Sequence, residues 1–312
     1  MHGDRTIRLG TRASRLALWQ AEHVQSLLTA SPDAPAVDII TISTEGDRIR
    51  DVPLSQVKGQ AFFTKEIEQA LLDEHIDLAV HSMKDLATEM PEGLALAAVP
   101  EREDHRDVLV SRTGVGLEDL PSGATVGTSS LRRKAFIAHL RPDLELRELR
   151  GNVPTRLGKL DAGAYDAVML AAAGVIRLGL AERISEVLDP AVFPPAPAQG
   201  ALALQTRADD AWTRRRIEAL DHPQTRRATT AERSLLRRVE GGCQVPVGVS
   251  STISGDTIEL QALVSSLDGT DTVDGTLSGP LDCAAEIGRD LAEILLGKGG
   301  DRILAAIRNQ NA

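Results

Sequence analysis

The sequence predicts an α/β fold made of two α/β units followed by a small C-terminal α+β domain. Short apolar runs alternate with amphipathic stretches before Pro100, and the same alternation restarts after it. From Val245 onward, strand-like runs come first and two helical stretches close the chain. Alternating strands and helices are typical of parallel sheets covered on both faces, whereas strands followed by helices indicate a separate α+β domain.

Hydrophobic periodicity divides each unit into elements. In the first unit we expect strands at 6–10, 37–42 and 76–80 and helices at 14–30 and 64–74. In the second we expect strands at 107–110, 124–127, 144–149 and 167–170 and helices at 131–140, 153–162 and 172–180. The proline-rich segment 193–198 is expected to cross between units, and the strand at 201–206 is a candidate to return to the first. The expected domains are therefore 1–100 with 200–219, 101–199, and 220–312, the last closing with helices at 282–296 and 301–309.

The composition is that of an ordinary globular protein and argues against several classes of function. Of 312 residues, 42% are hydrophobic and 26% are charged. With 2% aromatic residues and a formal charge of -10, the chain is not expected to bind nucleic acid. It contains no run of eighteen apolar residues, so no membrane span is expected.

Two features predict a cytoplasmic location. Residues 1–14 carry several charges and no continuous apolar stretch, which is unlike a secretory signal. The two cysteines, Cys243 and Cys283, could pair only once, which would be sparse for a secreted chain of this length.

Basic residues are concentrated between Gly127 and Arg177. This segment has nine Lys and Arg residues against five Asp and Glu residues, in a chain that is acidic as a whole. Arg132 and Arg133 follow the sequence GTSS at a predicted strand-to-helix turn, where free backbone N–H groups and the helix dipole favour an anion. Arg150 stands at the end of another predicted strand. The pattern favours an anion site.

Solvated, ion-paired helix faces are the alternative interpretation of these charges, and we assign Lys134, Arg141 and Lys159 to it.

The sequence HSMKD at 81–85 ends the predicted strand at 76–80. Consecutive residues of an extended segment point to opposite faces, so Lys84 and Asp85 can serve one small group only if the chain turns there. At the carboxyl end of a parallel strand, Asp85 is a candidate catalytic carboxylate, and a helix cap or surface ion pair is the alternative. His81 is assigned no catalysis, because a hydrogen-bonded structural role is at least as common. No cluster has metal-ligand spacing, so no metal is predicted.

Cys243 stands in the sequence EGGCQVP, after a long basic helix that is expected to end near Val239. Two glycines end that helix and Pro246 stiffens the exit, which places the thiol on a loop. The alternative is a packed or merely exposed thiol, and Cys283 on an amphipathic helix fits that alternative well.

Six collinear motifs together resemble the porphobilinogen deaminase family. They are GTRASRLALWQA at 10–21, HSMKD at 81–85, EREDHRDVLVS at 101–111, GTSSLRR at 127–133, LRGNVPTRL at 149–157 and EGGCQVP at 240–246. The resemblance extends over essentially the whole chain. It implies an α/β protein of two doubly wound domains resembling type II periplasmic binding proteins, plus a small C-terminal α+β domain.

The resemblance also implies the reaction. Four porphobilinogen molecules are joined head to tail, with loss of ammonia, and released as hydroxymethylbilane, an intermediate of haem biosynthesis. Growth begins on a dipyrromethane cofactor, which the resemblance attaches to Cys243 as a thioether. A soft sulfur nucleophile suits this bond, because it captures the electrophilic methylene-pyrrole formed when ammonia leaves.

By resemblance, Asp85 is the catalytic carboxylate, which stabilises the cationic intermediate and assists proton transfer. The growing chain gains an acetate and a propionate with each ring, which explains the need for cations. Cofactor-binding residues implied by the resemblance are Ser14, Lys84, Thr128, Ser129, Ser130, Arg132, Arg133 and Arg156. Substrate-binding residues implied by the resemblance are Arg12, Gln20, Arg150, Asn152 and Arg177.

The chain departs from the family pattern at a few positions. Gln56 and Gln60 stand where many relatives have lysines in a lid loop, and the charge is at Lys58 instead. Ala198 stands where a glycine is common. Two alternatives to the enzyme remain, a two-domain anionic solute-binding protein and a cofactor-bearing but inactive relative. The expected partner is the small-molecule substrate alone, and the expected state is a monomer.

Overall fold

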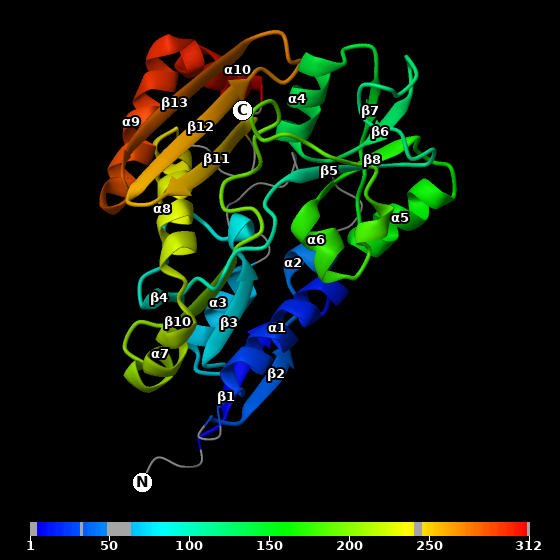
Figure 1. Ribbon diagram of the computed structural model, residues 1–312. Coiled ribbons are helices and arrows are strands. Elements are labelled where there is room, and N and C mark those ends of the chain that lie inside the picture. Colours follow the sequence, from blue (N-terminus) through cyan, green and yellow to red (C-terminus); the bar gives the residue numbers. More distant parts are fainter. Residues whose placement is uncertain (1–4, 32–33, 49–63, 240–244, 311–312) are drawn as a thin grey trace. The chain divides into compact units, whose positions relative to one another are not determined.

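The structure is a computed structural model that describes residues 5–31, 34–48, 64–239 and 245–310 (Figure 1). Its described residues form two units, the first comprising 5–31, 34–48, 64–103 and 200–226, and the second 104–199, 227–239 and 245–310. The chain therefore passes between the units after Glu103 and again after Gln199. The three domain boundaries expected from the sequence stay a prediction.

A five-stranded sheet forms the centre of the first unit. Its order is β2 (Val37–Thr41), β1 (Ile7–Thr11), β3 (Leu78–Ser82), β10 (Leu202–Arg207) and β4 (Leu94–Ala98). β1 pairs in parallel with β2 and β3, whereas β10 is antiparallel to β3 and β4. The strand expected to return to this unit does so. The antiparallel direction of β10, whose first residue Leu202 pairs with Ser82 at the end of β3, makes the sheet mixed.

Helices cover both faces of this sheet. The helices of this unit are α1 (Arg15–Leu28), α2 (Glu45–Arg48), α3 (Lys65–Leu72), α7 (Ala211–Ile217) and the start of α8 (Pro223–Arg238), which continues into the second unit. Ala21 and Val24 of α1 pack in one cluster with Leu78, whereas Ile67 of α3 packs with Ala79. Adjacent residues of a strand point to opposite faces, so α1 and α3 lie on opposite sides of β3.

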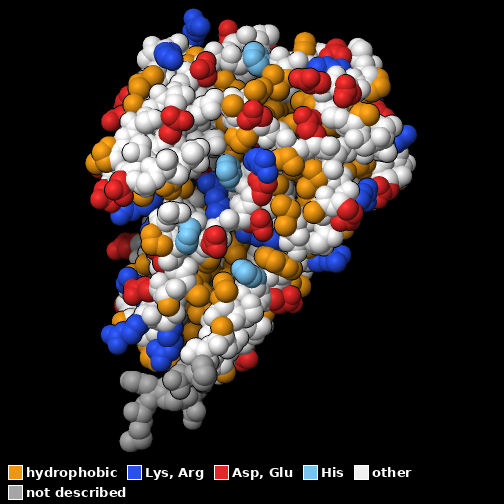
Figure 2. Space-filling view, viewed as in Figure 1, with side chains coloured by type: hydrophobic (Ala, Val, Ile, Leu, Met, Phe, Trp, Pro, Cys, Tyr) orange, Lys and Arg blue, Asp and Glu red, His pale blue; other side chains and the backbone are white. Residues whose placement is uncertain are grey.

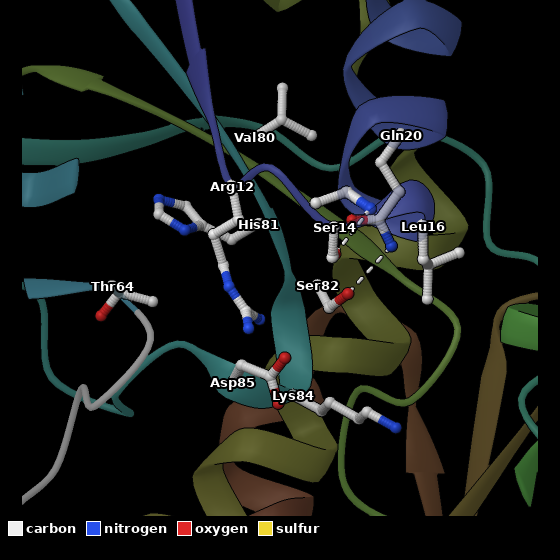
Figure 3. Close-up of a pocket in the computed structure, with 11 residues that line it drawn as sticks. Arg12, Ser14, Leu16, Gln20, Thr64, Val80, His81, Ser82, Lys84 and Asp85 are labelled. Carbon is white, nitrogen blue, oxygen red and sulfur yellow. Dashed lines mark hydrogen bonds between the residues drawn. The ribbon is translucent and has the colours of Figure 1, made fainter. Parts of the chain in front are cut away.

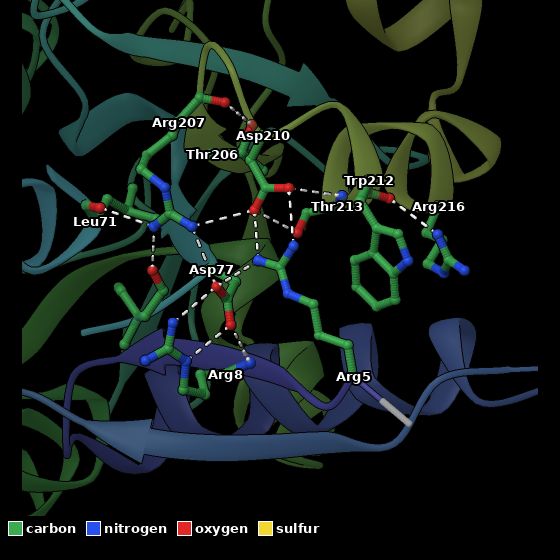
Figure 4. A network of polar contacts seen from close by, with 11 residues as sticks. Arg5, Arg8, Leu71, Asp77, Thr206, Arg207, Asp210, Trp212, Thr213 and Arg216 are labelled. Carbon is green, nitrogen blue, oxygen red and sulfur yellow. Dashed lines mark hydrogen bonds and ion pairs between the residues drawn. The ribbon is translucent and has the colours of Figure 1, made fainter. Parts of the chain in front are cut away.

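A charged network joins three strands at the end of the sheet where β3 begins (Figure 4). The Asp77 side chain, 1% exposed, accepts bonds from Arg8 Nε and Nη2 at 2.9 Å, from Arg5 Nη2 at 2.9 Å and from Arg207 Nη2 at 3.2 Å. Asp210 accepts from Arg5 and Arg207 as well. Burial alone would raise the pKa of Asp77, but these guanidinium bonds, led by Arg8, hold it well below its usual range.

We predict that Asp77→Asn lowers the free energy of unfolding by about 3 kcal/mol, because it removes a buried carboxylate that is the counter-charge of the largely buried Arg207 and of the half-exposed Arg5 and Arg8. Chemical denaturation at neutral pH measures this loss. The pKa of Asp77 is lower in the folded chain than in the unfolded chain, where it is about 3.9. Asp77 therefore contributes fully to the free energy of unfolding above that pH, and this contribution is lost as the pH falls further. The difference in free energy of unfolding between Asp77→Asn and the wild type should therefore become smaller in strong acid. An equal difference at all pH values would contradict this role of Asp77.

The second unit contains another five-stranded mixed sheet. Its order is β7 (Glu145–Arg147), β6 (Thr125–Gly127), β8 (Ala167–Ala171), β5 (Asp107–Ser111) and β9 (Glu186–Val187), with helices α4 (Leu131–Leu140), α5 (Val153–Asp161) and α6 (Ala172–Arg177). β6 is parallel to β7 and β8, whereas β5 is antiparallel to β8 and β9. The antiparallel strand β5 is the one by which the chain enters this unit.

Three antiparallel strands and two helices form the C-terminal part of the second unit. They are β11 (Val247–Ser254), β12 (Thr257–Ser265), β13 (Thr272–Pro280), α9 (Ala284–Leu295) and α10 (Asp301–Gln310). Side chains of α8, β12 and both last helices share one apolar core, which includes Leu235, Leu260, Leu291 and Leu304. The small α+β domain expected from the sequence is confirmed.

Short helical turns complete the described elements. They are η2 (Met83–Asp85), η3 (Ala181–Arg183), η4 (Glu218–Leu220), η5 (Leu281–Cys283) and the π-type turn η6 (Leu296–Gly300). Within the described ranges, each helix is too short or too polar to cross a membrane.

Ala198 adopts φ 59°, a left-handed backbone conformation that favours glycine. This is the position at which the family pattern has a glycine more often. The buried carboxylate of Glu232 accepts a bond from the Ala198 N–H at 2.7 Å and from the Ser251 hydroxyl at 2.5 Å. Glu232 therefore helps to hold this unusual backbone conformation in place.

Charged side chains are distributed without a large patch of one sign on the face of the molecule seen in Figure 2, where blue and red groups alternate. Many of them form pairs. Arg141 bonds to Asp143 at 2.7 Å, Lys134 pairs with Glu148, and Lys159 donates to the Arg150 carbonyl at 3.1 Å. The ion pairs expected for Lys134 and Arg141 are confirmed, and Lys159 bonds to the backbone instead.

Candidate active site

A pocket of about 130 Å³ lies in the first unit where β1 and β3 end (Figure 3). The carboxyl ends of parallel strands meet at one edge of a sheet, and ligands of α/β proteins bind there. The lining residues are Arg12, Ser14, Leu16, Ala17, Gln20, Thr64, Val80, His81, Ser82, Lys84 and Asp85. The structure thus brings together every candidate of the first unit: Arg12, Ser14, Gln20, Lys84 and Asp85.

A helical turn places Lys84 and Asp85 on the same pocket. The chain leaves β3 at Ser82 in an extended conformation and turns at once through η2, where the Leu86 N–H donates to the Met83 carbonyl at 3.2 Å. The sequence allowed Lys84 and Asp85 to serve one group only if the chain turned after the strand, because two consecutive residues of a continuing strand point to opposite faces. The turn η2 meets this condition. Lys84 and Asp85 can therefore serve one ligand.

The opposite wall of the pocket is the start of α1. Ser14 caps this helix by accepting the Ala17 N–H at 3.3 Å, and the side chain of Gln20, 3% exposed, donates to the Ser82 hydroxyl at 2.9 Å. Free N–H groups of the first turn and the helix dipole favour an anion near Ser14. With Arg12 and Lys84 against Asp85, the ionised side chains that line the pocket have a net charge of +1.

His81 lies in the same pocket but is buried and uncharged. Burial is the main cause that lowers its pKa, Arg12 adds to it, and a bond to Gln205 opposes both, so that the pKa is about 4. Its Nε2 lies 2.9 Å from Oε1 of Gln205. This is the hydrogen-bonded structural position that the sequence interpretation considered at least as common as catalysis. Gln205 was not identified from the sequence, because its position opposite β3 depends on the return of β10.

The hydroxyl cluster of the second unit follows β6 at the start of α4. Ser130 caps α4 by accepting the Arg133 N–H at 3.4 Å, and Thr128 accepts the Ser130 N–H at 3.3 Å. Ser129 donates to the Leu149 carbonyl at 2.8 Å, which ties this turn to the next strand-end loop. The three hydroxyls therefore lie at the strand-to-helix turn that the sequence predicts.

Arg132 and Arg133 are buried and share one carboxylate, Asp107. Arg132 Nη1 lies 2.6 Å from Asp107 Oδ2, and Arg133 Nη2 lies 2.6 Å from Asp107 Oδ1. The residues are 4% and 6% exposed, and Asp107 is fully buried. Burial alone would raise the pKa of Asp107, but Arg132 and Arg133 hold it well below its usual range. Two buried cations therefore share one anion, leaving a positive charge of one unit.

The sequence prediction for these two arginines was a ligand-binding role, and it stays a prediction. In the structure both guanidiniums already bind Asp107, so any ligand carboxylate must share them with it. Asp107 was missed as a site residue, although it stands in the motif EREDHRDVLVS that supported the resemblance. The sequence did contain a signal for Asp107, because it is an acidic residue within a family motif and the segment 127–177 has an excess of basic residues that need counter-charges.

The remaining candidates of the second unit lie around the start and end of its helices. Asn152 caps α5 by accepting the Thr155 N–H at 3.0 Å, and Arg156 Nε donates to the Gly151 carbonyl at 2.8 Å. Gly151 has φ 118°, a conformation that requires glycine between Arg150 and Asn152. Arg177, the last residue of α6, is buried. The structure thus shows where these four residues lie, and their binding of cofactor or substrate stays a prediction.

Several predicted features lie outside the described residues. They are Cys243 and the stretch with Gln56, Lys58 and Gln60. Among the described residues, no group of His, Cys, Asp or Glu could hold a metal ion. The absence of a metal stays a prediction.

The fold and the two clusters define a class: an α/β protein in which cationic and hydroxyl side chains gather at strand ends, beside the carboxylate of Asp85 in the first unit. A family model described as "Porphobilinogen deaminase, dipyromethane cofactor binding domain" matches residues 7–215, and one described as "Porphobilinogen deaminase, C-terminal domain" matches 227–297. The chain belongs to the porphobilinogen deaminase family.

Similar curated proteins bear the same name. A porphobilinogen deaminase of Geobacter metallireducens is 51% identical over 301 residues, covering 96% of this chain and 94% of its own. One of Pelobacter propionicus is 50% identical over 303 residues, covering 97% of each. Among solved structures, the methionine-binding protein MetQ is 14% identical with a TM-score of 0.45, covering 69% of this chain and 89% of its own. That similarity is too low to support an argument.

We predict that Asp107→Asn lowers the free energy of unfolding by about 3–5 kcal/mol, because it leaves two buried guanidiniums without their counter-charge. Chemical denaturation measures the change. The matched control is Asp161→Asn, which removes an exposed pair with Arg183 and should leave the midpoint nearly unchanged. Equal effects of the two substitutions would show that Asp107 does not stabilise the arginines as described.

Proposed function

We propose that this chain catalyses the porphobilinogen deaminase reaction, with Asp85 as the catalytic carboxylate. The single observation that carries the residue assignment is the convergence of Arg12, Lys84 and Asp85 on one pocket at the ends of β1 and β3. The two cations suit the acetate and propionate of porphobilinogen, and the carboxylate suits its amine and pyrrole N–H groups. Incubation with porphobilinogen, followed by oxidation and detection of porphyrin absorbance, tests the proposal.

Asp85 has two tasks in each cycle. It stabilises the positive charge that develops on the pyrrole as ammonia leaves and the methylene carbon becomes electrophilic. A carbon–carbon bond then forms between this methylene and the free ring carbon of the growing chain. That ring carbon loses its proton, and Asp85 assists the transfer. The balance of each cycle is one porphobilinogen added and one ammonia released.

The family's dipyrromethane cofactor would supply the ring carbon on which growth begins. The described donors fit such a group, because its carboxylates need N–H, hydroxyl and guanidinium donors. We assign it Ser14, Lys84, Thr128, Ser129, Ser130, Arg132, Arg133 and Arg156, with a thioether to Cys243. The buried positive charge left by Arg132, Arg133 and Asp107 supports this assignment. The incoming substrate is assigned Arg12, Gln20, Arg150, Asn152 and Arg177.

We propose a cytoplasmic monomer that needs no nucleic acid, membrane or metal. The low cysteine content supports the location. Analytical ultracentrifugation of the active protein tests the oligomeric state. An inactive relative would retain the cofactor but fail to consume porphobilinogen. A solute-binding protein is not favoured, since the chain belongs to an enzyme family.

We predict that Asp85→Asn lowers the rate about 10²- to 10⁴-fold, because the amide neither balances the developing charge nor moves a proton. Steady-state turnover of porphobilinogen measures the change, and circular dichroism checks the fold. Asp38→Asn, at an exposed position of β2, is the matched control and should retain full activity. A near-normal rate for Asp85→Asn would remove this residue from its assigned role.

We predict that the purified active chain exceeds its sequence mass by two linked pyrrole units, and that peptide mapping locates them on Cys243. Cys243→Ser should lack both the additional mass and the activity, because a hydroxyl is a far weaker nucleophile than a thiolate at neutral pH. An unmodified chain that turns over porphobilinogen at the full rate would refute the attachment.

A further inference from the structure

A chain of buried polar side chains leads from the pocket into the first unit. Nε2 of His81 lies 2.9 Å from Oε1 of Gln205, and Nε2 of Gln205 donates to Oε1 of Glu68 at 3.0 Å. The Thr64 hydroxyl donates to the other oxygen of Glu68 at 3.4 Å. His81, Gln205 and Glu68 are 5%, 0% and 6% exposed. Buried polar groups need such partners, so the three side chains depend on one another.

The register of the sheet makes these contacts possible. Gln205 of β10 pairs with Ala79 of β3, and Ala203 pairs with His81. Gln205 and His81 are therefore diagonal neighbours on one face of the sheet. Ile67 of α3 packs with Ala79 on this same face, which brings the following residue, Glu68, to Gln205.

The direction of the hydrogen bonds fixes the proton on His81. The Glu68 carboxylate accepts from Gln205, so the amide NH₂ of Gln205 faces Glu68, and its nitrogen also lies 2.9 Å from the Met90 sulfur. The amide oxygen of Gln205 then faces His81. Because a carbonyl oxygen only accepts, Nε2 of His81 must donate and carries the proton.

His81 is also uncharged at neutral pH. Its pKa is lowered to about 4, mainly by burial and also by Arg12, against an opposing contribution from the Gln205 bond. The charged groups nearby are Arg12 after β1, Glu68 of α3 beyond Gln205, and Lys84 and Asp85 of η2 in the same pocket. A neutral imidazole protonated at Nε2 has a lone pair at Nδ1, so His81 can only accept a hydrogen bond there.

We propose that Glu68 and Gln205 are positioning residues that fix His81 as the Nε2–H tautomer, so that Nδ1 accepts an N–H group of the ligand. The ligand group is a pyrrole N–H or an ammonium, because a lone pair at Nδ1 accepts only from a donor. This inference rests on the proposed function and adds to it a neutral acceptor that complements the charged one, Asp85. It also explains why a carboxylate is buried at Glu68, beyond the pocket wall.

The test reads the tautomer directly. ¹⁵N–¹H correlation spectra of the imidazole groups are recorded on the full chain with its cofactor, and the His81 signals are assigned by their loss in His81→Gln. In the wild type, His81 should be protonated at Nε2 only, with no titration between about pH 5 and 8. A protonated Nδ1, or a titration in that range, would overturn the proposal without the need for any further variant.

The variant Glu68→Gln tests the role of the positioning residues. The introduced amide can rotate to present either its oxygen or its NH₂ group, so Gln205 is no longer held in one orientation and a second His81 tautomer should appear. The value of kcat/KM for porphobilinogen should fall about tenfold, which corresponds to the loss of roughly one hydrogen bond to the ligand. The matched control, Glu22→Gln at an exposed position of α1, should change neither readout.

The outcomes separate this inference from the proposed function. A wild type that does not consume porphobilinogen would refute the function, while the tautomer is still read from the spectra. An unchanged tautomer in Glu68→Gln would refute the positioning role. A changed tautomer with unchanged kcat/KM would refute the role of Nδ1 in ligand binding.

Discussion

The pairing of β3 with strands on both sides is the constraint on which the proposed site depends. β1 holds one edge of β3 in parallel, and β10 returns from the second unit to hold the other edge in antiparallel pairing. With both edges paired, the end of β3 has a fixed position. The turn η2 then delivers Lys84 and Asp85 to the pocket, and β10 itself supplies Gln205 behind His81. A sheet closed only by sequential parallel strands would provide neither feature.

Buried carboxylates with two or more arginine partners recur in the two units. Asp77 joins the starts of β1 and β3 to the end of β10, and Asp107 joins β5 to the start of α4. Such groups cost free energy to bury, and good geometry with several guanidinium bonds offsets that cost. Asp77 lies at the opposite end of β3 from the pocket, so it stabilises the scaffold. Asp107 holds Arg132 and Arg133, the two arginines that we propose for the ligand, so under that proposal the same residues stabilise the fold and bind.

Local patterns in the sequence were sufficient for most elements of the fold. The predicted helices at 131–140 and 153–162 and the predicted strand at 107–110 match the structure to within one residue at each end. β4 was not predicted, and the antiparallel direction of β10 was not either, because strand pairing depends on contacts far apart in the chain. Local periodicity contains no information on the direction from which a strand returns.

The sequence predicted which residues belong to the candidate site, but not the hydrogen bonds and ion pairs that they form. Motifs identified Lys84, Asp85 and the arginines, whereas their partners Asp107, Gln205 and Glu68 come from distant segments. The sequence could not predict the turn that lets Lys84 and Asp85 face one pocket, because a three-residue turn has no recognisable hydrophobic periodicity.

The central claim is that a chain of pyrroles grows on this protein through the carboxylate of Asp85. Intact mass spectrometry of the protein after brief exposure to limiting porphobilinogen tests it most directly. The account predicts a ladder of masses in the wild type, in steps of one pyrrole unit above the cofactor-bearing chain, and the cofactor-bearing mass alone for Asp85→Asn. The same ladder formed at the same rate by both proteins would contradict it.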